Sequence, residues 1–293
     1  MTELEATGER FVPDEQHGEV VHAEHLARYL VAAQLAPSRR VLDAACGEGY
    51  GSGLLGAVAK SVTGVDIDER TVSHARSRHP GPEFVAADVS QLPFGDASFD
   101  LVVCFETIEH VPDPEGVLDE LRRVMAAEGL LLVSTPNKHQ YLVENEFHER
   151  EFFHEEFVAL LEARFERVQV LLQHNWLTSA VLAPALAGEA SGERPLEIEL
   201  RKVAGIEPGA ELYTLALCGS GELPGLRPAG VLSGVDEAHR LAQQLVAAER
   251  SAQGWHDEYR RAEQSLVRVY ESVWWRMTAP LRRVVELVRR RVG

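Results

Sequence analysis

Residues 41–51 read VLDAACGEGYG, and this stretch decides the fold expected for the chain. The apolar residues up to Cys46 are typical of a buried strand, and Gly47, Gly49 and Gly51 then predict a tight turn into a helix. Glycine adopts positive φ without steric cost and lets the backbone come close to a ligand. The N-terminus of the following helix would point at that ligand. Glycines at this spacing are weak evidence alone, because any tight strand-to-helix turn can use them.

Strands and helices alternate on both sides of this turn. The apolar pattern predicts strands at 40–45, 61–67, 83–87, 99–105, 130–134, 168–173 and 212–218, and helices at 19–36, 52–59, 69–78, 114–125 and 154–163. Seven strands interleaved with helices predict an α/β, Rossmann-like fold with a doubly wound, mostly parallel sheet. The Gly-, Pro- and Glu-rich stretch 183–208 is expected to be a partly helical insertion before the last strand.

A different pattern follows the last predicted strand. Residues 221–235 are rich in Gly and Pro and are expected to be a linker. Apolar residues then recur at alternating spacings of four and three: Leu241, Leu245, Ala248, Ala252, Trp255, Tyr259, Ala262, Leu266, Val269 and Val273. This heptad pattern favours a coiled-coil helix over 236–272 that makes the protein a homo-oligomer. A long helix packed on its own domain is the alternative.

The C-terminal residues 273–293 are basic, although the whole chain carries a formal net charge of −17. Six arginines stand there against one acid, Glu286, in an amphipathic pattern. Such a helix either lies on an anionic membrane surface or packs on the acidic body of this chain or of a partner. The acidic remainder disfavours binding to nucleic acid.

Cysteine usage and hydropathy indicate a cytoplasmic protein, at the inner face of the membrane if the basic tail binds lipid. The three cysteines lack C-x-x-C spacing, which argues against a disulfide framework and a structural zinc ion. Cys46 and Cys104 lie in strand-like apolar runs and are expected to be small buried hydrophobes. The N-terminus is polar and acidic, so no secretory signal is expected. The absence of an apolar run of about 18 residues predicts that no helix crosses a membrane.

Acidic residues close the two strands that follow the glycine turn. Asp66 ends the second strand, where a carboxylate can accept hydrogen bonds from both ribose hydroxyls; Asp68 is the better helix N-cap. Asp88 ends the third strand and can accept from an adenine amino group, while Val89 packs on the ring. A nicotinamide dinucleotide is disfavoured, because its motif needs glycine at position 52, which is Ser52, and has no use for Asp88.

The motifs D-x-x-C-G-x-G-x-G, V-D-I, A-D-V and F-D-L-V-V-x-x-E-x-I-E-H-V occur in this order and resemble class I S-adenosylmethionine (SAM)-dependent methyltransferases, especially the small-molecule branch. The resemblance covers residues 8–220 and implies a methyltransferase domain over 1–220, with a lid and helix in 1–37 and SAM as cofactor. Carried over residue by residue, it implies SAM contacts at Asp43, Gly47, Gly49, Asp66, Ile67, Asp88 and Val89, and at the backbone of Phe105 and Glu106.

The segment GERFVP at 8–13, with His25 and Tyr29, resembles a lid found in a subgroup of this family. In that arrangement Arg10 or Tyr29 pairs with the methionine carboxylate, which suits the fixed fork of a guanidinium group. A role in packing or at the surface is an equal alternative for both residues.

The loop ETIEHVPDP after the fourth strand supplies the candidate catalytic residues. A sugar hydroxyl is a poor nucleophile unless a base takes its proton, and the ordinary pKa of histidine suits that task at neutral pH. We therefore expect His110 to act near the methyl group; shaping the loop before Pro112 is the alternative. Glu106 and Glu109 are weaker candidates.

A second polar cluster follows the fifth strand at 145–154. His148, Glu149 and His154 either bind the acceptor, act as the base, hold a divalent ion or belong to a solvated loop. Their spacing matches no strong metal-binding template, so we assign no metal ligands. The aromatic residues of the cluster either stack on a sugar ring or pack in the core: Phe147, Phe152 and Phe153.

The lid, the E-T-I-E-H loop, S-T-P-N at 134–137 and F-H-x-x-E-F at 147–152 resemble methyltransferases of bacterial polysaccharide and glycoside biosynthesis. The tail W-R-x-T-x-P-L-R at 275–282 resembles tails of enzymes in those pathways. This resemblance implies O-methylation of a sugar hydroxyl on a glycan or glycosylated metabolite, and contact with a glycosyltransferase complex through 273–293. The alternatives are methylation of a quinone, phenol or amine, or a SAM-binding scaffold of a surface-polysaccharide complex.

Overall fold

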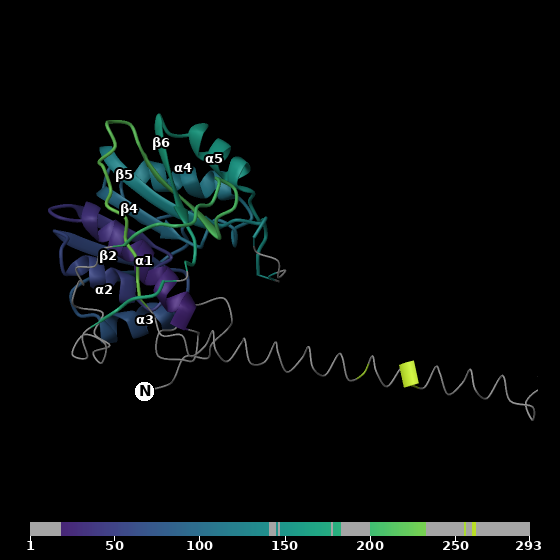
Figure 1. Cartoon of the computed structure of the whole chain (residues 1–293). Coiled ribbons are helices and arrows are strands. Elements are labelled where there is room, and N and C mark those ends of the chain that lie inside the picture. The colour runs from purple at the N-terminus through teal and green to yellow at the C-terminus, as the bar shows by residue number, and fades with distance from the viewer. Residues whose placement is uncertain are drawn as a thin grey trace, which may run out of the picture. The chain divides into compact units, whose positions relative to one another are not determined.

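The computed structural model describes residues 19–140, 145, 147–176, 178–182, 200–232, 255, 260 and 261 (Figure 1). The chain divides into two units, Met1–Ser233 and Gly234–Gly293, and the second contains three described residues: Trp255, Arg260 and Arg261. The lid residue Arg10 and the basic tail at 273–293 lie outside the described residues. The same holds for the coiled coil at 236–272, apart from those three residues, so these features remain predictions.

Seven strands form one sheet, as the alternating pattern predicts, and their order is β3-β2-β1-β4-β5-β7-β6. The strands are β1 (Arg40–Ala44), β2 (Ser61–Asp66), β3 (Glu83–Ala86), β4 (Phe99–Phe105), β5 (Met125–Pro136), β6 (Arg167–Gln173) and β7 (Tyr213–Gly219). β7 runs antiparallel between β5 and β6, and the other pairings are parallel. Because β1 and β4 are neighbours although they are separated in sequence, the chain order reverses between them, and such switch points are where α/β sheets bind ligands.

Helices cover both faces of the sheet (Figure 1). They are α1 (Glu19–Leu35), α2 (Tyr50–Gly56), α3 (Glu69–Arg78), α4 (Pro114–Val124) and α5 (His154–Glu162). Alternate residues of a strand point to opposite faces. Val41 and Leu101 accordingly pack with α1 and α2, whereas Leu42 and Val102 pack with α4 and α5. Each fully buried side chain of this kind contributes roughly 1.5–3 kcal/mol, so both faces stabilise the sheet.

The predicted boundaries shift where the chain changes direction. α2 begins at Tyr50 rather than at position 52, because Gly49 takes the N-cap position in a left-handed conformation (φ 81°). β5 extends beyond the predicted 130–134 at both ends, because Met125 pairs with Phe99 of β4 and β7 pairs with the strand as far as Pro136. The predicted N-cap of α3 is confirmed, since the carboxylate of Asp68 accepts a hydrogen bond from the backbone N–H of Arg70 at 3.0 Å. All three cysteines are free and buried, which confirms the burial predicted for Cys46 and Cys104.

The predicted linker is attached to the domain over its described part. Residues 221–232 contain no helix or strand, but the backbone of Arg227 makes two hydrogen bonds to the side chain of Gln34 in α1. Leu223 and Leu226 pack against the core beneath α1. Within the described ranges, no helix is long and apolar enough to cross a membrane.

Close packing of α1 on α2 depends on the third glycine of the turn. A Cβ atom at Gly51 would lie 1.9 Å from Cζ of Tyr29, whose ring crosses α2 at this point. Gly51 is therefore required by helix packing, whereas Gly47 and Gly49 have positive φ and are required by the turn itself.

Gly51→Ala is expected to lower the free energy of unfolding by about 2–3 kcal/mol, as overpacking of a core does. Without the Tyr29 ring, alanine would favour the helix by about 1 kcal/mol. The matched control is Gly53→Ala in the same helix, whose Cβ would lie 2.8 Å from Nδ1 of His79, an imidazole at the end of a side chain that can move aside. Urea unfolding measures both variants, and equal free energies for the two would contradict this explanation.

Candidate functional site

The chain leaves the carboxyl end of β1 through a turn with left-handed backbone conformations, of which only the one at Ala45 is unfavourable for its residue type. Ala45, Gly47 and Gly49 have φ values of 60°, 54° and 81°. A Cβ at Gly49 would lie 2.6 Å from the ring of Phe84, so a larger residue does not fit there. The backbone N–H of Gly47 donates to Oδ2 of Asp66 at 3.0 Å, which ties the turn to the end of β2.

Asp43 lies beneath the turn and is only 1% exposed. Its carboxylate accepts hydrogen bonds from the hydroxyl of Tyr29 at 3.0 Å and from the hydroxyl of Ser52 at 2.6 Å. Burial raises the pKa of Asp43 to about 6, although both hydrogen bonds favour the ionised form. Tyr29, expected as a partner of the methionine carboxylate, is itself buried and holds Asp43 from α1. The sequence predicted its place in the helix but not this role.

The ends of β2 and β3 present the predicted acids at the same edge of the sheet. Asp66 is 8% exposed, and its Oδ1 accepts the backbone N–H of Asp68 at 3.0 Å. Ile67 is apolar and yet 72% exposed, which suits a residue that a planar ring would cover. Beyond β3, Asp88 is exposed while Val89 is buried, and Oδ1 of Asp88 accepts the N–H of Ser90 at 2.8 Å.

Glu106, directly after β4, turns the chain with a left-handed φ of 49°. The hydroxyl of Ser134 in β5 donates to its Oε1 at 2.6 Å, and Nη1 of Arg28 lies 3.4 Å from the same oxygen. Burial raises the pKa of Glu106, and the positive charge of Arg28 opposes that rise. Glu106, predicted as a catalytic candidate, is thus held by two side chains.

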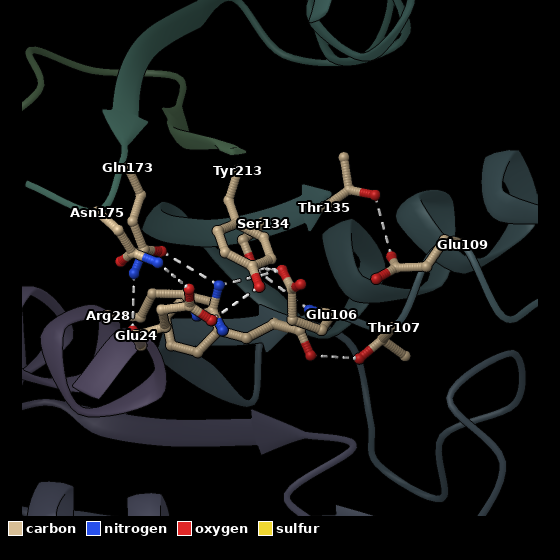
Figure 2. Close-up of polar contacts among 11 residues, drawn as sticks. Glu24, Arg28, Glu106, Thr107, Glu109, Ser134, Thr135, Gln173, Asn175 and Tyr213 are labelled. Carbon is tan, nitrogen blue, oxygen red and sulfur yellow. Dashed lines mark hydrogen bonds and ion pairs between the residues drawn. The ribbon is translucent and has the colours of Figure 1, made fainter. Parts of the chain in front are cut away.

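Arg28 of α1 is at the centre of a buried network that the sequence did not reveal (Figure 2). The side chain is 1% exposed, donates to Gln173 at 3.1 Å and lies over the ring of Tyr213 at 4.5 Å. Glu24, one turn earlier in α1, accepts the hydroxyl of Tyr213 at 2.8 Å. One feature of the sequence could have indicated this network. Arg28 lies on the apolar side of a predicted helix, and a buried arginine needs a partner for its charge.

Glu109 is buried at the opposite side of the same loop. Its Oε2 accepts the hydroxyl of Thr135 at 3.1 Å (Figure 2), whereas its Oε1 has no hydrogen-bond partner in the described structure. Burial and the nearby charge of Glu106 raise the pKa of Glu109. The carbonyl of Glu109 accepts the N–H groups of Glu149 and Arg150 at 2.9 and 3.1 Å, and so joins this loop to the second polar cluster.

The hydrogen bond of the His110 ring indicates which tautomer the neutral ring adopts. Nδ1 lies 3.0 Å from the carbonyl oxygen of Phe147. Because a carbonyl only accepts, Nδ1 carries the proton and the neutral ring has its lone pair on Nε2. His148 packs edge-to-face on this ring at 4.7 Å. The two histidines predicted from separate motifs therefore meet.

The ring of His148 is 5% exposed and is oriented by Asn145. Oδ1 of Asn145 accepts the N–H of Phe147 at 3.1 Å, which directs its amide nitrogen to Nε2 of His148 at 3.0 Å. Nδ1 of His148 has no hydrogen-bond partner among the described residues and lies 3.6 Å from Oε1 of Glu151. Burial and the adjacent His110 lower the pKa of His148.

The remaining members of the second cluster lie apart from these histidines. Glu149 is exposed, and His154 at the start of α5 pairs through Nδ1 with the fully buried Glu211. Phe152 is in the core, whereas Phe147 and Phe153 are about one third exposed, at 36% and 38%. The structure therefore brings His148 into the site and leaves His154 as an anchor of α5.

Comparison with known proteins gives a match to the family model "Methyltransferase domain" over residues 42–133. A Mycobacterium tuberculosis protein described as a probable S-adenosylmethionine-dependent methyltransferase is 42% identical over 163 residues, which cover 54% of this chain and 60% of that protein. A Mycolicibacterium smegmatis protein with the same description is 40% identical over 169 residues, or 56% of this chain and 66% of that protein.

A solved structure shares the fold over most of the domain. The Thermotoga maritima protein described as a SAM-dependent methyltransferase, possible histamine N-methyltransferase, is 25% identical with a TM-score of 0.52. The match covers 73% of this chain and 98% of that one. This chain spans about 60% of the length of the tuberculosis relative. The comparisons identify a SAM-dependent methyltransferase domain and confirm the predicted enzyme class and methyl donor for it.

Tyr29→Phe is expected to destabilise the protein by about 1–3 kcal/mol at neutral pH, the worth of a hydrogen bond to a charged group. Because burial raises the pKa of Asp43 to about 6, the stability that this group contributes is present at low pH and is lost as the pH rises through that value. The hydroxyl of Tyr29 stabilises the ionised form of Asp43, so the penalty of the variant is expected to be larger above pH 6, where the carboxylate is charged.

Urea unfolding at pH values on both sides of the Asp43 pKa measures this difference. Ser52→Ala, which removes the second donor to Asp43, is expected to show the same trend. A penalty that is independent of pH in both variants would contradict the assignment of Asp43 as the group beneath the turn.

Proposed function

We propose that the whole chain transfers a methyl group from SAM to a small molecule. The observation that carries this proposal is the arrangement at the carboxyl edge of β1, β2 and β3. There the glycine turn, Asp66, the exposed Ile67 and Asp88 follow one another at the switch point of the sheet. The methyltransferase domain found by comparison includes all of them.

The residues present fit SAM in chemistry. Gly47 and Gly49 let the backbone approach the methionine part, and Asp66 would accept hydrogen bonds from the ribose hydroxyls. Asp88 would accept from the adenine amino group, and Ile67 would lose its large solvent-exposed surface against the ring. The backbone of Phe105 and Glu106 would lie beside the methionine. Asp43 and Tyr29 would not contact SAM; they lie beneath the glycine turn and stabilise its conformation.

The acceptor side favours a hydroxyl. SAM supplies a methyl group on a sulfonium, and methylation of a hydroxyl releases one proton that must be removed. His110 offers a lone pair on Nε2, because its Nδ1 proton is donated to Phe147. We therefore place loss of the hydroxyl proton at His110. His148 contacts the same ring, and Glu106 shapes the floor of the site through Ser134 and Arg28.

Two acceptor classes remain in this proposal. A sugar hydroxyl of a glycan or glycosylated metabolite is favoured by the sequence resemblance of the lid, the E-T-I-E-H loop and the tail to polysaccharide and glycoside methyltransferases. An amine is favoured by the description of the Thermotoga maritima relative as a possible histamine N-methyltransferase. A neutral amine carries its own lone pair and needs no base, so dependence on His110 separates the two classes.

Assembly belongs to the same proposal. The heptad pattern at 236–272 would join copies of the chain, and the basic residues at 273–293 would contact an anionic membrane surface or a glycosyltransferase complex. A SAM-binding scaffold without turnover is the alternative, and retention of Asp43, Asp66 and Asp88 argues against it.

Binding of SAM is expected to weaken about tenfold or more in Asp66→Asn and in Asp88→Asn, because each loses a charge-assisted hydrogen bond. Isothermal titration calorimetry on the full chain measures the affinity. Asp119→Asn is the matched control, since Asp119 on α4 is 62% exposed and pairs with Arg164 at the surface, away from the proposed cofactor site. Unchanged affinity in the folded Asp66 and Asp88 variants would refute the assigned cofactor site.

His110→Gln is expected to reduce methylation of hydroxyl acceptors about 100-fold or more while SAM affinity stays constant. Labelled SAM, incubated with sugar nucleotides, glycans, glycosides, phenols, reduced quinones and amines, identifies the acceptor and gives the rate. His139→Gln, which changes an exposed histidine, is the control. Full turnover by His110→Gln would remove His110 from the chemistry and favour an amine.

A further inference from the structure

We propose that Glu109, His110 and His148 bind a divalent transition-metal cation at the acceptor side of the site. One possible ligand atom from each residue lies within 4.8 Å of those of the other two. Two residues come from the loop after β4 and the third from the segment after β5. The hydrogen bonds from the N–H groups of Glu149 and Arg150 to the carbonyl of Glu109 hold the two segments together.

The buried carboxylate of Glu109 supplies an independent reason for a cation. The residue is 1% exposed, and only Oε2 is satisfied, by Thr135. Oε1 is buried and has no hydrogen-bond partner within the described part of the chain. A buried carboxylate oxygen left without a partner costs free energy, and a bound cation removes that cost.

The histidines have the surroundings of metal ligands. A histidine that binds a metal through one nitrogen usually donates its other N–H to a carbonyl or carboxylate. His110 does so from Nδ1 to the carbonyl of Phe147, which leaves the Nε2 lone pair for a cation. Thr135 performs the same orienting task for the carboxylate of Glu109.

His148 contributes the third ligand by exchanging one contact for another. Its Nε2 accepts from the amide of Asn145, and its Nδ1 is buried near Glu151. A cation that takes a lone pair from this ring replaces the Asn145 contact or displaces the Nδ1 proton. Metal binding to histidine is pH-dependent for the same reason.

The donor set selects the class of cation. Two imidazoles and one carboxylate suit Mn²⁺, Co²⁺ or Zn²⁺, whereas Mg²⁺ and Ca²⁺ prefer oxygen ligands alone. Three protein ligands also leave coordination positions open, as catalytic metal sites do and structural sites do not. An oxygen of the acceptor can fill one of these positions.

This inference rests on the proposed function in one respect only, the identity of the acceptor oxygen that would fill the open coordination position of the cation. A cation lowers the pKa of a hydroxyl that it binds, so the hydroxyl proton is lost to solvent more easily. His110 then acts through the cation instead of taking the proton itself. The acceptor would need an oxygen able to bind the cation beside the methylated position, as a vicinal diol of a sugar provides.

The test is a direct binding measurement on the full chain after chelation and dialysis. Calorimetric titration with Mn²⁺ and with Zn²⁺ is expected to give one site per chain. Glu109→Gln and His148→Gln are expected to weaken it about tenfold or more each. His139→Gln is the matched control, because His139 is exposed and outside the cluster. This control is needed because the chain has 12 histidines that can bind metals weakly.

A spectrum of the wild-type chain gives a second measurement that needs no variant. Co²⁺ bound by nitrogen ligands is expected to produce visible absorption. Added Zn²⁺ is expected to displace Co²⁺ and remove this absorption, whereas added Mg²⁺ is not. Absence of that absorption, or equal Mn²⁺ affinity in the wild type and both ligand variants, would overturn the metal site.

SAM affinity, measured on the metal-free chain and on each variant, reports folding and tests the proposed function separately. Retained SAM binding without metal binding refutes only the cation. Metal binding without SAM binding refutes the proposed function and leaves the cation site supported.

Discussion

The buried hydrogen bonds between Asp43, Tyr29 and Ser52 are the interaction on which the rest of the site depends. They place a carboxylate directly under the glycine turn, where burial alone would disfavour its charge. Tyr29 reaches Asp43 only because Gly51 leaves room for its ring. One contact therefore fixes three things: how α1 packs on α2, where β1 ends, and how Gly47 and Gly49 present their backbone at the carboxyl edge of the sheet.

The two halves of the proposed site are built on different parts of the sheet. The proposed donor half uses the ends of β1, β2 and β3, where Gly47, Asp66 and Asp88 lie at or shortly after the last strand residue. The acceptor half uses the ends of β4 and β5, where Ser134 and Thr135 hold Glu106 and Glu109. Arg28 links the acceptor half to α1, because it approaches Glu106 and Gln173 from that helix. The sheet order, with β1 beside β4, brings the halves together.

Much of this arrangement could be predicted from the sequence, because it depends on local rules. Strand alternation, the glycine spacing and the acids at strand ends predict the seven strands and the positions of Asp66, Asp88 and His110. The Arg28 network, the Asp43–Tyr29 bond and the meeting of His110 with His148 join residues distant in the chain. The hydrophobic periodicity of a sequence does not predict which distant residues will pair. His148 and His154 both follow a phenylalanine in the sequence, and only their partners in the fold separate them: His110 and Asn145 contact His148, whereas Glu211 pairs with His154.

The hydrogen bonds from Glu149 and Arg150 to the carbonyl of Glu109 use main-chain atoms alone. Their formation therefore does not depend on which side chains are present at 147–152, provided that no proline removes a backbone N–H donor. Side chains in this segment can therefore be substituted while the loop stays attached to the end of β4 and the proposed cofactor acids are unchanged. This separation would allow acceptor specificity to be altered at one end of the sheet while the proposed SAM site at the other end is retained.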